Sequence, residues 1–306
     1  MTKRLFTKDE LEWLALSGAE RVRRTLARGD APRAREEFAK VIGLYRQFHD
    51  LYHGWTSSLF AHLNATYGHE FTKASTHLEH TLARHAEIGM NLTGVRVFLD
   101  APEEHFAARL AAGDSAGAFE YYLEVERGAR DLHDFYRDYV SYIMSNVYKA
   151  HGVAALEQCL RASSEQDWMP WMMQDIEAGP RERLVTWAEL LGVANFGSLT
   201  LEEHDDRFVM IQNPCGSCGR QHRGGRYDDP WGLAVVTEEH PITYGQGGAT
   251  TYRTHIPVMH YLMPLERIGA PWPLIQCPRS KSGQCRITLF KDSRRGIAAR
   301  DARWSD

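Results

Sequence analysis

The sequence predicts an α+β protein in which a duplicated all-helical N-terminal domain precedes a small antiparallel β-rich module that binds metal. Three observations support this prediction: an internal repeat with helical spacing in the first half, short apolar runs separated by Gly, Pro and Asp from Leu199 onward, and four of the five cysteines in the second half. A prior of about 150 residues per domain gives two domains for 306 residues. We place them at residues 1–168 and 169–306.

The repeat aligns residues 26–68 with residues 110–152 without a gap, at an offset of 84. Each copy begins with a Gly-Asp pair that caps a helix and ends at a glycine, and apolar residues recur at spacings of three and four between them. The full units extend over about 26–84 and 110–166. We therefore expect two equivalent helical units related by an approximate two-fold axis.

Both copies carry a His-Asp pair. His49 and Asp50 in the first copy correspond to His133 and Asp134 in the second. One interpretation makes them packed residues with structural hydrogen bonds, since an unpaired buried polar group costs about 1–3 kcal/mol. The other makes them catalytic, with the histidines facing a shared pocket as ligands or proton shuttles and the aspartates orienting them. Under this second hypothesis four aromatic residues bind the substrate: Tyr52, Trp55, Tyr136 and Tyr252.

The second half is expected to form strands at "DRFVMIQNP", "WGLAVVTEE", "PLIQCP" and "CRITLFKD", with one helix at "PVMHYLMPLERIG". His255 stands at the start of this helical segment. The helix N-terminus is expected to lower the pKa of His255, so that the ring stays a neutral ligand or base near pH 7. His255 is therefore a candidate for both catalysis and metal binding.

Four cysteines are candidate metal ligands. Cys215 and Cys218 are two residues apart in the glycine-rich turn "NPCGSCGRQH", and Cys277 and Cys285 bracket a predicted hairpin turn. Four thiolates arranged in this way resemble a zinc ribbon, in which each sulfur lies about 2.3 Å from one tetrahedral zinc. We predict zinc as the cofactor, with iron as the alternative, and His255, His260 or His222 as a substitute for one cysteine.

Three other interpretations of the Cys215–Cys218 pair are weaker. A thioredoxin-like redox pair opens a helix inside a βαβ unit, and the residues that follow here, "GRQHRGGRYDDP", predict no good helix. The letters "CGSC" also occur at the papain-type nucleophile, but that pattern continues with Trp or Tyr where this chain has Gly219. In the third interpretation the pair only forms a structural turn.

Composition excludes little. The net charge is −4, although residues 277–306 carry eight Lys/Arg and three Asp, a net charge of +5. The first residues show no apolar stretch typical of a signal peptide, and no window approaches the length of a membrane span. We expect a soluble, cytoplasmic protein with a small-molecule substrate, no membrane partner and no preference for nucleic acid. The oligomeric state stays open, with a homo-oligomer among the options.

Several short motifs occur together in this chain. The helical half has the His-Asp-x-Tyr motif of His49, Asp50 and Tyr52. The second half has "PCGSCGR", a Tyr-x-x-His motif at Tyr252 and His255, and a terminal hairpin beginning "CR". This combination resembles a bacterial family without assigned activity, and the likeness spans both halves. The resemblance implies no reaction.

The sequence thus favours a metal-dependent enzyme, and within that class a hydrolase acting on a small polar molecule between the helical repeats and the Cys/His module. One alternative is a zinc-ribbon protein that binds nucleic acid or has a regulatory role. A second alternative is an interaction scaffold built on the helical repeat.

Overall fold

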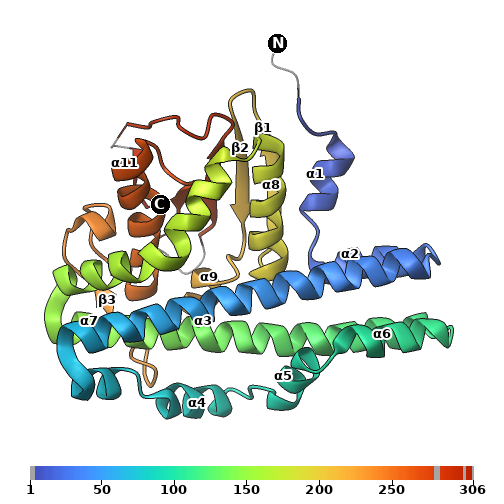
Figure 1. Ribbon diagram of the computed structural model, residues 1–306, viewed down its shortest axis with the longest axis horizontal. Coiled ribbons are helices and arrows are strands. Elements are labelled where there is room, and N and C mark those ends of the chain that lie inside the picture. Colours follow the sequence, from blue (N-terminus) through green and yellow to red (C-terminus); the bar gives the residue numbers. More distant parts are fainter. Residues whose placement is uncertain (1–3, 279–282, 299–300, 305–306) are drawn as a thin grey trace.

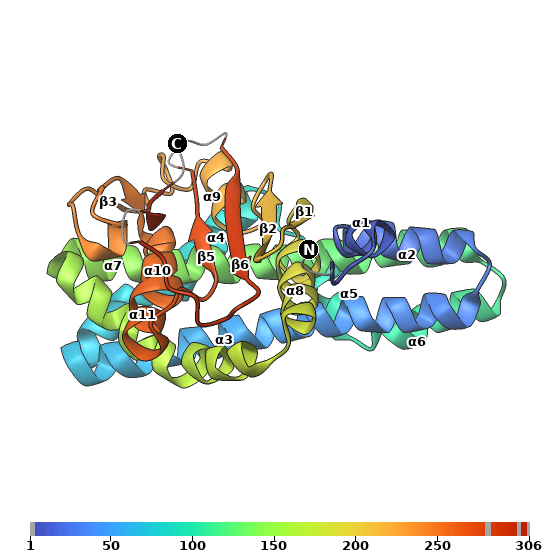
Figure 2. The ribbon, with the colours of Figure 1, turned by 90° about the horizontal axis from the view of Figure 1, so that it is seen from above.

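Two long helices, α3 (Ala31–Ser75) and α7 (Ser115–Glu177), form the axis of the molecule and lie side by side in both views of the computed structural model (Figures 1 and 2). The structure describes residues 4–278, 283–298 and 301–304. In Figure 1 the sheet lies on one side of this pair, and α4 and α5 lie on the other. No helix within the described ranges is long and apolar enough to cross a membrane.

The helices before the two long ones confirm a helical repeat. Helix α2 (Gly18–Ala27) precedes α3, and α6 (Pro102–Ala111) precedes α7, so both elements of the second pair begin 84 residues after those of the first. Asp30 and Asp114 are the N-caps of the long helices, and each side chain accepts a hydrogen bond from the backbone three residues on. A carboxylate there satisfies an amide that the helix leaves unpaired, which is why the Gly-Asp pair marks both starts.

Each long helix is broken at the glycine that the repeat shares. Gly68 has φ +79° and ψ 174°, and Gly152 has φ +79° and ψ −176°. This conformation is open essentially to glycine alone, because a Cβ atom would clash with the backbone. The sequence places the same break in both copies, and the structure shows it.

After these breaks the two copies differ. The first ends at Ser75 and continues through α4 (Leu78–Glu87) and α5 (Leu92–Leu99), whereas α7 continues to Glu177. Residue 168, the predicted domain boundary, therefore lies inside α7. The N-terminal α1 (Lys8–Leu14) contacts the sheet through β1.

The C-terminal part begins with α8 (Pro180–Ala188) and a π-helical segment, η1 (Glu189–Ala194). An antiparallel sheet follows with strand order β1-β2-β6-β5, as the sequence predicts for a small β-rich module. Its strands are β1 (Leu199–Glu203), β2 (Arg207–Gln212), β6 (Cys285–Phe290) and β5 (Leu274–Gln276). A two-stranded sheet joins β3 (Val235–Val236) to β4 (Ala249–Thr250).

The expected helix near residue 257 is present as a composite. It comprises η3 (Thr251–Thr254), α10 (His255–Pro257), the π-helical η4 (Val258–Leu262) and α11 (Met263–Ile268), and a short turn, η2 (Pro241–Thr243), precedes it. One hydrophobic core joins the two parts of the chain, since Trp55 and Leu59 of α3 belong to the same cluster as Phe208 and Ile287 of the sheet. The site described next lies in this shared core.

One prediction about local structure is wrong. The residues after Cys218, which predict no good helix, form α9 (Cys218–Arg223). Its stability comes from tertiary contacts: the Gln221 amide nitrogen donates to Asp138 Oδ1 at 2.9 Å and to Ser141 Oγ at 2.6 Å, both on α7. Such contacts override weak helix propensity. A βαβ unit is nevertheless missing here, because β2 is paired antiparallel on both sides.

Candidate metal centre and adjoining cavity

The sheet brings the four cysteines of the second half together. Cys285 is the first residue of β6, which lies between β2 and β5. Its register partner is Gln212 at the end of β2, so the turn that carries Cys215 begins beside it. On the other side β5 ends at Gln276, opposite Arg286, which places Cys277 beside Cys285. Antiparallel pairing on both sides of one central strand therefore explains the convergence.

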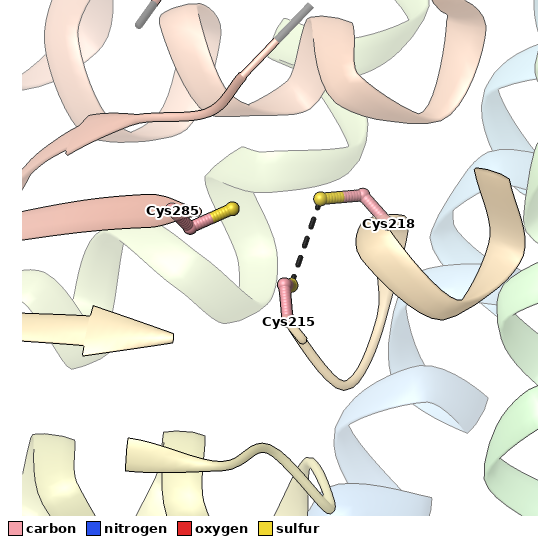
Figure 3. Close-up of side chains that lie close together, drawn as sticks. All are labelled: Cys215, Cys218 and Cys285. Carbon is pink, nitrogen blue, oxygen red and sulfur yellow. Dashed lines mark hydrogen bonds between the residues drawn. The ribbon is translucent and has the colours of Figure 1, made fainter. Parts of the chain in front are cut away.

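All four thiols are buried and close together. Cys218 Sγ lies 3.6 Å from Cys215 Sγ and 3.8 Å from Cys277 Sγ, and Cys285 Sγ lies 3.1 Å from Cys277 Sγ. The sulfurs of Cys215, Cys218 and Cys285 all lie within 4.8 Å of one another, and Figure 3 shows them pointing toward a common centre. Three buried cysteines at this spacing could hold a metal ion.

The spacing fits a single metal ion. Four sulfurs at about 2.3 Å from one tetrahedral ion lie about 3.8 Å apart. Three of the sulfur–sulfur separations, 3.1–3.8 Å, fall at or under that edge length, and the group in which every sulfur lies within 4.8 Å of the others is Cys215, Cys218 and Cys285.

A buried arginine supplies positive charge to the cysteines. Arg253 is 3% exposed, and its Nε has no hydrogen-bond partner among the described residues. Although burial disfavours the charged form, the thiolates of Cys218 and Cys277 raise the pKa of Arg253. Hydrogen bonds from Cys218 and Cys285, with Arg253 adding to the effect, lower the pKa of Cys277 to about 5. Hydrogen bonds among the thiols also lower the pKa of Cys218 and raise the pKa values of Cys215 and Cys285. Two of the four sulfurs are thus favoured as thiolates, the form that metal coordination requires.

Gly216, between Cys215 and Cys218, has a steric role. A Cβ atom at this position would lie 1.5 Å from the backbone oxygen of Asn195. Only glycine permits this approach, which holds the cysteine turn against the end of η1. Ser217 then reaches Asn195, and its Oγ donates to Asn195 Oδ1 at 2.5 Å.

A partly enclosed cavity of about 80 Å³ adjoins the cysteines. Its wall includes all four cysteine residues of the cluster, and most of the rest of it is aromatic or aliphatic. Polar side chains are contributed by Asn195, Gln212 and Ser217. Both π-helical segments border the cavity through Leu190 of η1 and His260 of η4. Such segments recur at functional sites.

Two histidines face this cavity as neutral rings. His255 Nδ1 donates to the carbonyl oxygen of Tyr252, and His260 Nδ1 donates to the carbonyl oxygen of Trp272 at 2.5 Å. Burial lowers the pKa of His255 to about 4 and that of His260 to about 3. Burial, and not the helix N-terminus, is therefore the leading cause of the predicted shift at His255. With Nδ1 occupied, Nε2 of each ring is left as a base or ligand, and no described residue bonds to it.

The aromatic residues predicted to bind substrate divide into two groups. Tyr52, Trp55 and Tyr252 line the cavity, and the hydroxyls of the two tyrosines lie 2.5 Å apart. The Trp55 ring lies 5.5 Å from the ring of His255. Tyr136 lies outside this cavity, on the wall of a smaller one.

The second His-Asp pair lies one side chain away from the cavity. His133 is buried, and its Nε2 lies 2.9 Å from Oδ1 of the cavity residue Asn195. Its Nδ1 lies 2.9 Å from Asp134 Oδ1 and 3.2 Å from Arg220 Nη2. Although burial raises the pKa of Asp134, the guanidinium groups of Arg137 and Arg220 hold that pKa well below its usual range.

The first His-Asp pair lies nearer solvent. The Asp50 side chain is 82% exposed, and His49 Nδ1 is 3.4 Å from it. His49 and His133 line the same small cavity of about 10 Å³, which is about the volume of one water molecule. The structure therefore gives the two histidines a common small cavity, while only His133 is linked to the larger one.

Sequence inspection missed several residues of this region. Asn195 carries no periodic or motif signal, and Ser217 is not among the predicted site residues although it lies inside the "PCGSCGR" motif. His85 is also buried, with its Nε2 3.1 Å from Asp138 Oδ2. Its partner lies 53 positions later in the chain, so no local pattern reveals it.

No family model, curated protein or solved structure matches this chain. Function is therefore argued from the geometry of the site.

Proposed function

We propose that the chain is a metal-dependent enzyme, a hydrolase, that acts on a small molecule bound in the 80 Å³ cavity. One observation carries the proposal: the cysteine cluster, two neutral histidines and an aromatic wall share one partly enclosed cavity. Metal ligands, a base and a water-excluding wall are the parts that such chemistry needs.

The thiols of Cys215, Cys218, Cys277 and Cys285 would hold zinc or iron, and the buried charge of Arg253 would offset the charge of the thiolates. When bound, such an ion polarises an oxygen of the substrate. An ion held by three cysteines keeps one position for the substrate, whereas four cysteines close the site and make it structural. In the closed case the histidines alone carry the chemistry.

His255 is proposed as the base. Its Nδ1–H donates to the Tyr252 carbonyl oxygen, which leaves Nε2 free to act as the base. Nε2 accepts a proton from a water molecule as that water attacks the carbonyl carbon of the substrate. The bond to the leaving group then breaks, and the same nitrogen returns the proton to the leaving group. The wall around His255 is mainly apolar, which supports a substrate with an apolar body in place of the small polar molecule expected from sequence.

The nucleic-acid alternative is weakened by how the basic tail is used. Lys291 contacts Glu203 and Arg294 contacts Glu177, both at 2.7 Å, and Arg295 pairs with Asp206. These cations are neutralised by carboxylates of the same chain and are not free for phosphate.

One feature favours the scaffold alternative. Five of the eight exposed large apolar side chains among the described residues lie on or between α4 and α5: Leu78, Leu82, Ile88, Leu92 and Leu99. An exposed apolar group of this kind is typical of an interaction surface.

The test is hydrolysis of small esters and amides, such as methyl formate and acetamide, by the metal-loaded protein in a pH-stat. We expect zinc- or iron-dependent turnover that falls by at least about 100-fold in His255→Ala. Cys159→Ser is the matched control, because Cys159 is buried and free but lies outside the cluster. Equal turnover of wild type and His255→Ala would contradict the proposed base.

A further inference from the structure

Asn195 forms a polar part of an otherwise mainly apolar wall. It directly follows η1, is 4% exposed and lines the cavity. Its side-chain oxygen has two partners: Oδ1 lies 2.9 Å from His133 Nε2 and 2.5 Å from Ser217 Oγ. Within residues 4–278, 283–298 and 301–304, no hydrogen bond is made by its Nδ2. The fully buried side-chain atoms that lack a partner do not include Nδ2, so protein atoms do not enclose this nitrogen completely.

Ser217 determines which way this amide faces. Its hydroxyl donates to Asn195 Oδ1 at 2.5 Å, and an amide nitrogen could not accept that bond. His133 Nε2 lies 2.9 Å from the same oxygen and therefore carries a proton that it donates to Oδ1. The other ring nitrogen, Nδ1, lies between an acceptor, Asp134 Oδ1 at 2.9 Å, and a donor, Arg220 Nη2 at 3.2 Å. The two bonds to Asn195 Oδ1 leave Nδ2 turned away from both partners.

We propose that Asn195 Nδ2 donates a hydrogen bond to an oxygen of the ligand in the cavity, with His133 as the positioning residue that orients the amide. This inference rests on the proposed function, in which the cavity is the ligand site. The ligand class is a small molecule with one carbonyl-type oxygen on an apolar body. A cavity of about 150 Å³ accommodates benzene, so a ligand in about 80 Å³ is smaller than benzene.

In a hydrolase this donor would face the oxygen on which negative charge develops. Removing one such donor typically lowers the rate by about 100- to 1,000-fold. The hydrogen bond itself is tested without turnover, by comparing two probes of similar size in the wild-type protein. Acetone carries the carbonyl oxygen, and 2-chloropropane has a similar size with a weakly accepting chlorine in its place.

The experiment titrates each probe into the full-length, metal-loaded protein and measures Kd by ligand-observed NMR. Asn195→Asp keeps Oδ1 and the shape of the side chain but removes the NH2 donor, and Asn195→Leu removes both polar atoms. We expect either variant to raise the Kd of acetone by about 10-fold and to leave the Kd of 2-chloropropane within about 2-fold of the wild-type value. Asn64→Asp, at an exposed position of α3, is the control and should change neither.

His133 is tested through the same ratio of affinities. His133→Gln places an amide NH2 near the position of Nε2 and should keep acetone binding. His133→Leu removes the donor, frees the Asn195 amide to rotate, and should weaken acetone alone. A merely structural role of His133 would weaken both probes together.

The outcomes separate the two proposals. If neither probe binds the wild-type protein, the cavity is not the ligand site, and both the proposed function and this inference fall. If both probes bind and the acetone-to-2-chloropropane ratio is the same in wild type, Asn195→Asp and Asn195→Leu, only the role of Asn195 falls. Should one Asn195 variant not fold, the ratio in the other decides.

Discussion

The two copies of the helical repeat have the same backbone conformation up to their glycine breaks, and they differ in the side chains that pack on them. His49 and Asp50 face toward solvent, with Asp50 82% exposed. At the equivalent positions of the second copy, His133 is buried and Asp134 is bonded by Arg137 and Arg220. The difference arises because Asn195, which follows η1, bonds to His133, and Arg220 of α9 bonds to Asp134. Among the described residues, neither segment bonds to His49 or Asp50. The same local motif therefore acquires a different role from its tertiary neighbours.

The frame beneath the two copies remains nearly symmetric. The Tyr52 ring lies 5.4 Å from that of His133, and the equivalent Tyr136 ring lies 5.2 Å from that of His49. The two tyrosines stack on each other at 6.2 Å. An approximate two-fold axis between α3 and α7 requires this exchange of partners. The copies thus diverged in charge and hydrogen bonding while the packing of their rings was kept.

The largest expected difference concerns Asp138, whose counterpart in the first copy is Gly54. Asp138 is fully buried and bonded by Arg137 and Arg226. Asp138→Asn should destabilise the fold by about 3–5 kcal/mol, because Arg137 loses a buried counter-charge. Chemical denaturation measures the free energy of unfolding. The control is Asp50→Asn at an exposed position, whose free energy of unfolding should lie within about 0.5 kcal/mol of the wild-type value. Similar values for both variants would show that the charged network is not what distinguishes the copies.

The repeated glycines test the shared frame. Gly68→Ala and Gly152→Ala should each cost about 1–3 kcal/mol, because alanine is strained at φ +79° with ψ near 180°. The two costs should agree within about 0.5 kcal/mol if the copies are equivalent in backbone. A large cost at one glycine and none at the other, in the same denaturation assay, would break the proposed equivalence.

The pH dependence of stability should separate the copies in the same way. Although burial raises the pKa of Asp138, Arg137 and neighbouring groups lower it from 3.8 to about 2. Because the folded pKa is depressed, the stabilisation is present above pH 4 and is lost as the pH falls toward 2. The stability difference between wild type and Asp138→Asn should shrink by roughly 2 kcal/mol across that window. A difference that stays constant from pH 6 to pH 2 would contradict the assignment.

The smallest expected effect is at the paired tyrosines. Tyr52→Phe removes a buried hydrogen bond to Tyr252 and should cost about 1 kcal/mol. Tyr136→Phe should be close to neutral, since the Tyr136 hydroxyl has no partner among the described residues. Thermal unfolding of the two variants side by side checks this, and equal costs would remove the asymmetry at this pair.

The features of the fold that sequence predicts are those encoded locally. The Asp caps, the glycine breaks and the short apolar run of β6 each follow from a few consecutive residues. Helix α9 could not be predicted, because Gln221 is held by Asp138 and Ser141, which lie about 80 positions earlier. The two π-helical segments also have no sequence signal.

The site follows the same division. Cysteine spacing predicts the convergence of Cys215, Cys218 and Cys285, because thiol ligands recur at recognisable intervals. Asn195 and Ser217 enter the cavity only through the close approach at Gly216, which is visible once the chain is folded. The partners of His133 likewise come from distant segments, so the sequence left its role open.

The most direct test of the account is the metal content of the purified protein, measured by plasma mass spectrometry against protein concentration. We expect one zinc or iron per chain in wild type and in Cys159→Ser. In Cys215→Ser and in Cys285→Ser we expect less than about half of that, with lower thermal stability, because metal binding contributes to folding. Wild-type protein without stoichiometric metal, or cluster variants that retain it fully, would contradict the claim that these cysteines form the metal centre.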